Sequence, residues 1–224
     1  MLREFYRRRL PHIIPIGATF FVTFRLHGSI PKAILEKLAR KRDAELEKLF
    51  FKDDLTETDR QQAEVAIERQ YWIEFNDTLD TIKEGPHHLG IPELAQIVVD
   101  RLKVFDGQHY NLCSYVVMSN HVHALLDFSV QLQNAEGKVN EHTYKQLDKV
   151  MHLVKGSSAK FCNDWLRGQQ MPTFNPFWEH ESHDRFMRNE RHHQITVTYI
   201  LNNPVKVGIC KNWQDFPFAY VARP

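Results

Sequence analysis

The sequence predicts an α+β fold in which helices cover one face of a mainly antiparallel β-sheet, with an inserted helical hairpin. Two strand patterns joined by a tight turn at Ser119-Asn120 indicate an antiparallel pair. Apolar residues recur at helical spacing in several separate segments between the strand patterns. Strands and helices alternate irregularly along the chain, which is typical of an α+β arrangement.

The chain has 224 residues, of which 42% are hydrophobic and 12% are aromatic. This composition suffices for one domain with a large insertion, so we expect a single domain over residues 1–224 with a helical insertion at about residues 45–90. No apolar run approaches membrane-spanning length, and no signal peptide follows the basic N-terminus, so we expect a cytoplasmic protein with no membrane partner. The three cysteines are widely spaced and indicate neither a disulfide framework nor a zinc finger.

The net charge of +1 averages two unlike parts of the chain. Residues 53–84 contain ten acidic and three basic residues, whereas the remainder carries 26 basic and 18 acidic residues. This basic excess, which begins with Arg7-Arg8-Arg9, permits a polyanionic partner. A run of charges is more often simply a solvated surface, and that interpretation also stays open for these arginines.

The first elements are expected as one strand and two helices. Residues 18–26 are rich in β-branched and aromatic side chains and predict a strand. A proline suits the first turn of a helix, so Pro31 predicts a helix start, and a second helix is expected from Thr56. These two helices would form the inserted hairpin. The following glycine-proline loop carries His87 and His88, which we expect to be exposed.

Six further segments complete the predicted fold. They are a helix over 92–105, the central strand pair over 110–127, a polar loop over 131–142, a long helix over 147–165, an extended segment over 177–187 and a helix over 190–203. The last helix is expected to stop at Pro204, because a proline disfavours the helical conformation of the residue before it.

His121 and His123 fall on the second strand of the central pair. Side chains alternate along a strand, so residues two apart project from the same face. Two neighbouring imidazole nitrogens suit a borderline metal ion. Without further evidence, such a pair more often marks two polar residues on the solvated face of a sheet.

Tyr199 and Asn203 add to this pair. They are neighbours one turn apart on the last helix, and Tyr199 lies away from the apolar stripe that contains Ile200. Two imidazoles and an amide oxygen can hold a divalent ion that polarises a phosphoryl oxygen, and a phenol oxygen can attack phosphorus. A packing role for the Tyr199 ring is the alternative.

These motifs resemble those of the REP-associated tyrosine transposases, relatives of the single-strand transposases of bacterial insertion sequences. The family's Met-Pro-Asn-His-Val-His corresponds to residues 118–123, and its Tyr-Ile-x-Asn-Asn-Pro-Val-x-x-Gly to residues 199–208. Its Phe-Trp, Asp-Arg and Arg-Asn-Glu motifs correspond to residues 177–178, 184–185 and 188–190. The resemblance spans nearly the whole chain. It departs at Ser119, where the family has proline, and in residues 179–183.

The resemblance implies a ferredoxin-like fold and a metal-dependent endonuclease and strand-transferase that cuts single-stranded DNA at palindromic hairpins through a 5′-phosphotyrosine. It implies that His121, His123 and Asn203 bind a divalent metal, Mg or Mn, and that Tyr199 is the nucleophile. The expected partner is single-stranded hairpin DNA. The sequence leaves the oligomeric state open between monomer and dimer.

Four basic residues are candidates for DNA binding: Arg185, Arg188, Lys206 and Lys155. Arg185 pairing with a neighbouring carboxylate as surface structure is an equally good interpretation. Two other functions also stay open. One is a metallohydrolase with a water nucleophile, which would need further His or Asp ligands close by; the other is a non-catalytic protein that binds hairpin DNA or RNA.

Overall fold

The computed structural model describes residues 5–7, 11–13, 15–52, 54–132, 140 and 143–222. The chain forms two compact units, one made of Met1–His27 with His87–Pro224 and the other of Gly28–Pro86. Arg8, Arg9 and most of the polar loop expected over 131–142 lie outside the described residues. None of the described helices has the length and apolar character needed to cross a membrane.

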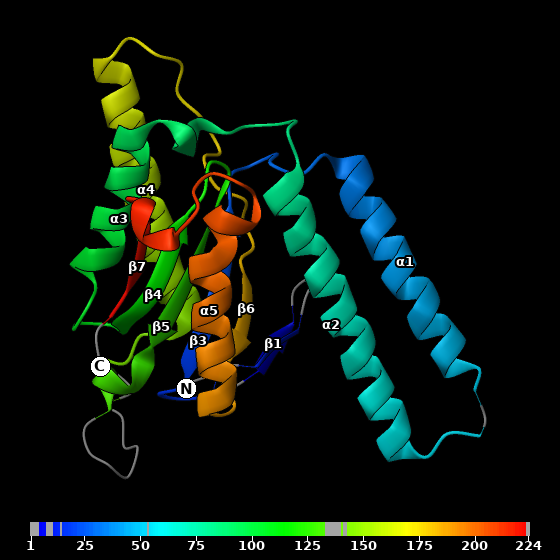
Figure 1. The fold of residues 1–224 in the computed structure, drawn as a ribbon. Helices are drawn as coiled ribbons and strands as arrows, with labels where there is room; N and C mark the ends of the chain where they lie inside the picture. Colours follow the sequence, from blue (N-terminus) through cyan, green and yellow to red (C-terminus); the bar gives the residue numbers. More distant parts are fainter. Residues whose placement is uncertain are drawn as a thin grey trace. The chain divides into compact units, whose positions relative to one another are not determined.

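The larger unit contains a five-stranded antiparallel sheet with the strand order β6-β3-β5-β4-β7 (Figure 1). Its strands are β3 (Thr19–Arg25), β4 (Asn111–Val117), β5 (His121–Asp127), β6 (His183–Phe186) and β7 (Ala219–Val221). The histidine strand β5 is central, between β3 and its hairpin partner β4. The predicted first strand and central strand pair are therefore confirmed. A separate two-stranded sheet consists of β1 (Phe5–Arg7) and β2 (Pro11–Ile13).

The core of this unit follows a ferredoxin-like order. The elements β3, α3 (Pro92–Val104), β4, β5, α4 (Leu147–Gly168) and β6 occur in the order βαββαβ. The fourth and first strands of this series are neighbours, followed by the third and the second. The predicted α+β class is thus confirmed. The three-residue strand β7 extends the sheet beyond β4 and was not predicted.

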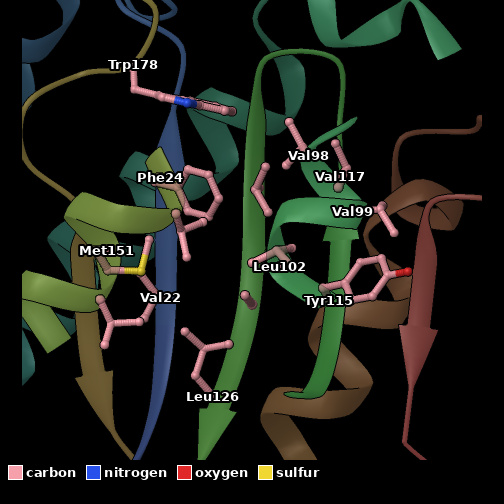
Figure 2. Packing of buried hydrophobic residues seen from close by; sticks show 14 of the residues in the cluster. Val22, Phe24, Val98, Val99, Leu102, Tyr115, Val117, Leu126, Met151 and Trp178 are labelled. Carbon is pink, nitrogen blue, oxygen red and sulfur yellow. The ribbon is translucent and has the colours of Figure 1, made fainter. Parts of the chain in front are cut away.

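Helices α3 and α4 cover one face of the sheet and enclose the main core (Figure 2). The strands contribute alternate residues, so the core-facing positions of β5 are Val122, Ala124 and Leu126. Burying each large apolar side chain stabilises the fold by about 1.5–3 kcal/mol. The side chains that meet in this core include Val22, Phe24, Val98, Leu102, Tyr115, Val117, Met151 and Trp178. The residues between these positions on β5, including both histidines, therefore face away from α3 and α4.

Helix α5 (Glu190–Lys206) lies against that other face of the sheet. The prediction that it stops at Pro204 is wrong, because the helix runs two residues further. A buried proline within the last turn removes one backbone donor and leaves the rest of the turn intact. The helix closes instead at Gly208, which has a φ of 76°. The N–H of Ile209 donates to the Pro204 carbonyl at 2.9 Å, as in a Schellman motif.

The smaller unit is a helical hairpin of α1 (Lys32–Phe50) and α2 (Glu57–Thr81). Both helix starts agree with the sequence, and the Thr56 hydroxyl accepts a hydrogen bond from the Asp59 N–H at 3.1 Å. The Arg60 guanidinium donates to the Leu49 and Lys52 carbonyls, each at 2.8 Å, and so ties the end of α1 to the start of α2. Elsewhere, the described residues include three short 3₁₀ helices: η1 (His88–Gly90), η2 (Phe128–Gln131) and η3 (Trp213–Asp215).

Candidate functional site

His121 and His123 project from one face of β5, as their spacing predicted, and both are completely buried. Their Nε2 atoms are 3.1 Å apart. Imidazole nitrogens bind metal ions at about 2.0–2.1 Å, so two of them at a right angle about one ion are about 3 Å apart. The pair therefore has the geometry of two neighbouring ligands of a divalent ion.

The other ring nitrogen of each histidine has a fixed partner. His121 Nδ1 lies 2.7 Å from Asn120 Oδ1, and His123 Nδ1 lies 2.8 Å from Thr23 Oγ1. An amide oxygen only accepts hydrogen bonds, so the His121 tautomer with its proton on Nδ1 donates to it and presents the lone pair of Nε2. The Thr23 hydroxyl can accept in the same way from His123. Such partners orient metal-binding histidines and fix the tautomer.

His123 is kept neutral by its surroundings. Burial lowers its pKa well below the usual value, and nearby His121 and Lys206 lower that pKa further. A histidine must be neutral to bind a metal. The donor set at this position thus fits a divalent cation without the loss of a proton.

Helix α5 brings the predicted nucleophile to the histidine pair. The Tyr199 ring lies 5.4 Å from the His123 ring, centroid to centroid, and meets the Phe21 ring edge-on at 5.9 Å. Its hydroxyl oxygen is shielded from solvent. Asn203 lies one turn further along α5 and is 1% exposed. The structure therefore brings His121, His123 and Tyr199 together, with Asn203 on the adjacent turn of the same helix.

The strand register arranges further polar residues beside the histidines. Directly opposed residues of an antiparallel pair share one face of the sheet. Thr23 is opposed to His123 on one side and to His183 of β6 on the other. Two residues along β3, Arg25 is opposed to His121. Two polar rows therefore lie side by side on β3 and β5, on the face that α5 covers.

The Arg25 row extends to Glu179, which sequence reasoning missed. Leu26 bridges Trp178 in antiparallel fashion, and the Glu179 N–H donates to the Arg25 carbonyl at 2.9 Å. The Glu179 carboxylate oxygen lies 3.4 Å from Arg25 Nη1 and 3.3 Å from His27 Nδ1. In the sequence, Phe21, Thr23 and Arg25 recur with a period of two. This period could have predicted that Arg25 lies on the same face of the sheet as Thr23. The sequence held no comparable signal for its partner.

Three of the basic candidates lie on β6, on α5 or in the link between them. Arg185 is opposed to Phe21 and so shares the face of the histidines. Arg188 is exposed in the link from β6 to α5, with its guanidinium carbon 5.7 Å from the Phe186 ring. Lys206 ends α5 and acts on the pKa of His123.

Lys155 lies on α4, which covers the opposite face of the sheet. Its ammonium donates to the His180 carbonyl at 2.8 Å and to the Ser182 hydroxyl at 3.4 Å. Residues 180–182 separate the Glu179 and His183 registers with β3, where β3 has only Phe24, so Lys155 holds a bulged segment with two extra residues just before β6. The structure does not group it with the other three basic candidates.

The histidines of the loop before α3 are not exposed as expected. His88 stacks on Phe174 with ring centroids 3.9 Å apart, and burial lowers its pKa to about 4. His87 Nδ1 lies 2.8 Å from the hydroxyl of Ser119. The serine of the β4–β5 turn thus binds this loop through a hydroxyl that a proline would lack.

Comparison with protein-family models gives no match, and no curated protein matches the sequence. Among solved structures, the chain is similar to a REP-associated tyrosine transposase bound to a REP hairpin. The two chains share 15% sequence identity with a TM-score of 0.44, and the alignment covers 96% of this chain and 80% of the other.

Proposed function

We propose that the protein is a metal-dependent single-stranded DNA endonuclease and strand-transferase that acts at palindromic hairpins. The observation that carries the proposal is the meeting of two elements. The Nε2 atoms of His121 and His123 converge at 3.1 Å on β5, and α5 lays the ring of Tyr199 against His123. A metal-binding pair beside a tyrosine hydroxyl suits phosphoryl transfer to that hydroxyl.

His121, His123 and Asn203 would hold the cation, Mg or Mn. All three ligands are neutral, so the bound ion keeps its full double charge and is suited to an anionic phosphodiester. When bound, it polarises a phosphoryl oxygen and stabilises the charge that develops on the departing oxygen.

Tyr199 would attack the scissile phosphorus. A bond forms between its phenol oxygen and phosphorus, and the bond from phosphorus to the DNA 3′ oxygen breaks. The phenol gives up its proton as this bond forms, and the departing 3′ oxygen takes one up. The products are a 5′-phosphotyrosine and a free 3′-hydroxyl, and attack by a 3′-hydroxyl on the phosphotyrosine reverses the step and joins strands.

Two features of this chain would assist the attack. A phenol has a pKa of about 10 in isolation, so a positive charge near the site favours the reactive phenolate. Lys206 supplies one such charge, since it acts on His123, the ring against which Tyr199 lies. The contacts of the tyrosine ring with His123 and Phe21 restrict its orientation.

The test is a covalent protein–DNA adduct. A single-stranded hairpin oligonucleotide, labelled at its 3′ end, is incubated with the protein and Mn and resolved on a denaturing protein gel. The label should move with the protein, and the adduct should be absent with Tyr199→Phe. Cleavage without an adduct would instead indicate a water nucleophile. Tight hairpin binding without cleavage would favour the non-catalytic binder that the basic excess outside residues 53–84 also permits.

A further inference from the structure

We propose that Arg25 binds the scissile phosphate beside the histidine pair and that Glu179 positions its guanidinium. This inference rests on the proposed function and adds a substrate-binding residue to it. Arg25 is not one of the basic residues of the recognised motifs. It is the last residue of β3, the strand that supplies Thr23 to His123.

The placement of Arg25 follows from the strand register. Arg25 and His121 are directly opposed in the β3–β5 pair. Opposed residues have Cβ atoms about 4.5–5.5 Å apart and share one face of the sheet. The Arg25 side chain therefore leaves β3 beside His121, the first proposed metal ligand, on the face of the sheet that α5 covers. None of the other proposed DNA-binding arginines is directly opposed to a histidine of the pair.

Glu179 fixes the arginine from the other side of β3. The Glu179 side chain contacts Arg25 Nη1 at 3.4 Å, and its backbone N–H binds the Arg25 carbonyl at 2.9 Å. The Arg25 side chain is only 10% exposed. A long side chain held at both its backbone and its head loses little freedom when it binds an anion.

The charges also favour phosphate binding. A nearly buried ion pair adds little stability relative to apolar residues of the same size. The position of the Arg25–Glu179 pair next to His121 is therefore better explained by a role in phosphate binding than by a contribution to stability. A guanidinium presents a planar fork that matches two oxygens of one phosphate. Glu179 offsets the arginine charge while the site has no substrate.

The test is a coupling measurement that does not depend on catalysis. In the Tyr199→Phe background and with excess chelator, so that no metal contacts the phosphate, the affinity for a hairpin oligonucleotide is measured with a native scissile linkage and with a neutral methylphosphonate there. The methylphosphonate should weaken binding about 10- to 100-fold when Arg25 is present, the range of a hydrogen bond to a charged group. Arg25→Gln should weaken binding of the native oligonucleotide by a similar factor. It should also abolish the penalty of the methylphosphonate.

Two further variants make the result specific. Arg25→Lys keeps the charge without the fork, so it should retain only part of the penalty. Arg191→Gln removes an exposed arginine from the first turn of α5 and should retain the full penalty. If thermal unfolding shows that Arg25→Gln does not fold, the double variant Arg25→Met with Glu179→Met is used in its place. It removes both charges of the ion pair.

A full methylphosphonate penalty in every Arg25 variant would overturn the inference. The two proposals fail separately. If the unmodified protein forms the tyrosine adduct but Arg25 shows no coupling, only the role of Arg25 is wrong. If no adduct forms at all, the proposed function itself is wrong, whatever the coupling.

Discussion

The imidazole of His123 touches both Thr23, through Nδ1 at 2.8 Å, and the ring of Tyr199, at a centroid distance of 5.4 Å. His123 thus lies between the Thr23 hydroxyl, which orients its ring, and Tyr199, the proposed nucleophile on α5. We expect replacements of the two residues to have different effects, because Tyr199 is proposed to act on DNA and Thr23 only on His123.

Replacing Tyr199 by Phe should abolish cleavage and leave folding and hairpin binding intact. The variant loses only the hydroxyl and keeps the ring contacts with Phe21 and His123. Cleavage of a labelled single-stranded hairpin and its binding by fluorescence anisotropy are measured side by side. Cleavage at a comparable rate by the phenylalanine variant would show that Tyr199 is not the nucleophile.

Replacing Thr23 by Val should weaken metal binding about 10- to 100-fold, the usual effect of losing a partner that orients a histidine ligand. The Thr23→Ser variant keeps the hydroxyl and should bind metal nearly as well as the unmodified protein. Titration of Mn into the DNA-free protein by calorimetry gives both affinities. Equal affinities for the valine and serine variants would mean that the hydroxyl does not orient His123.

The stability of the fold should fall as the pH drops from about 6.5 toward 4. Burial against Phe174 lowers the pKa of His88 to about 4, whereas in the unfolded chain it has its ordinary value of about 6.5. The unfolded state therefore binds more protons within this window, so acid favours unfolding. His88→Phe keeps the stacking and removes the titration, so urea unfolding should depend less steeply on pH.

The exposed His152 offers a matched control for that measurement. Its replacement by Gln shows how far the loss of a solvent-exposed imidazole alone changes the unfolding measurement. A His88→Phe variant as sensitive to pH as the unmodified protein would mean that other groups cause the loss of stability.

Excess chelator should abolish cleavage, and either Mg or Mn should restore it. Two imidazoles and an amide form a softer ligand set than the oxygen-rich sites that Mg prefers, so Mn should act at lower concentration. The double variant His121→Ala with His123→Ala should lose metal-dependent cleavage but still bind the hairpin. Full cleavage in the presence of chelator would mean that the histidine pair has another role.

Much of the fold could be predicted because its signals are local. The runs of β-branched, aromatic and apolar residues in β3 and β5 predict strands that are buried on both faces, and the cap at Thr56 needs only its own helix. The end of α5 was misjudged at Pro204, since the helix runs two residues further, to Lys206, and closes at Gly208. Strand β7 is three residues long, too short for a recognisable period.

The site was predicted only in part, for a related reason. His121 and His123 lie two apart in one strand, so strand geometry alone places them together. The contact of Arg25 with Glu179 joins residues more than 150 positions apart, and it depends on a strand register that no local pattern reveals. The same holds for His88, whose burial depends on Phe174.

The salt dependence of hairpin binding should separate the basic residues into two groups. Arg188 is exposed in the link from β6 to α5 and Lys206 is exposed at the end of α5, so we expect each to contact a phosphate. Removing one phosphate contact from single-stranded DNA reduces the slope of log affinity against log salt by about 0.7, and from duplex by about 0.9. Arg188→Ala and Lys206→Ala should each show such a reduction.

Lys155→Ala is the matched comparison, because its ammonium is bound to the bulged segment at His180 and Ser182. A lysine held in this way contributes to the structure of the edge strand and releases no counterion when DNA binds. The alanine variant should therefore unfold at a lower temperature while its salt slope stays the same. A reduced slope with an unchanged unfolding temperature would place Lys155 in the DNA contact surface. An unchanged slope for Arg188→Ala would remove that arginine from the surface.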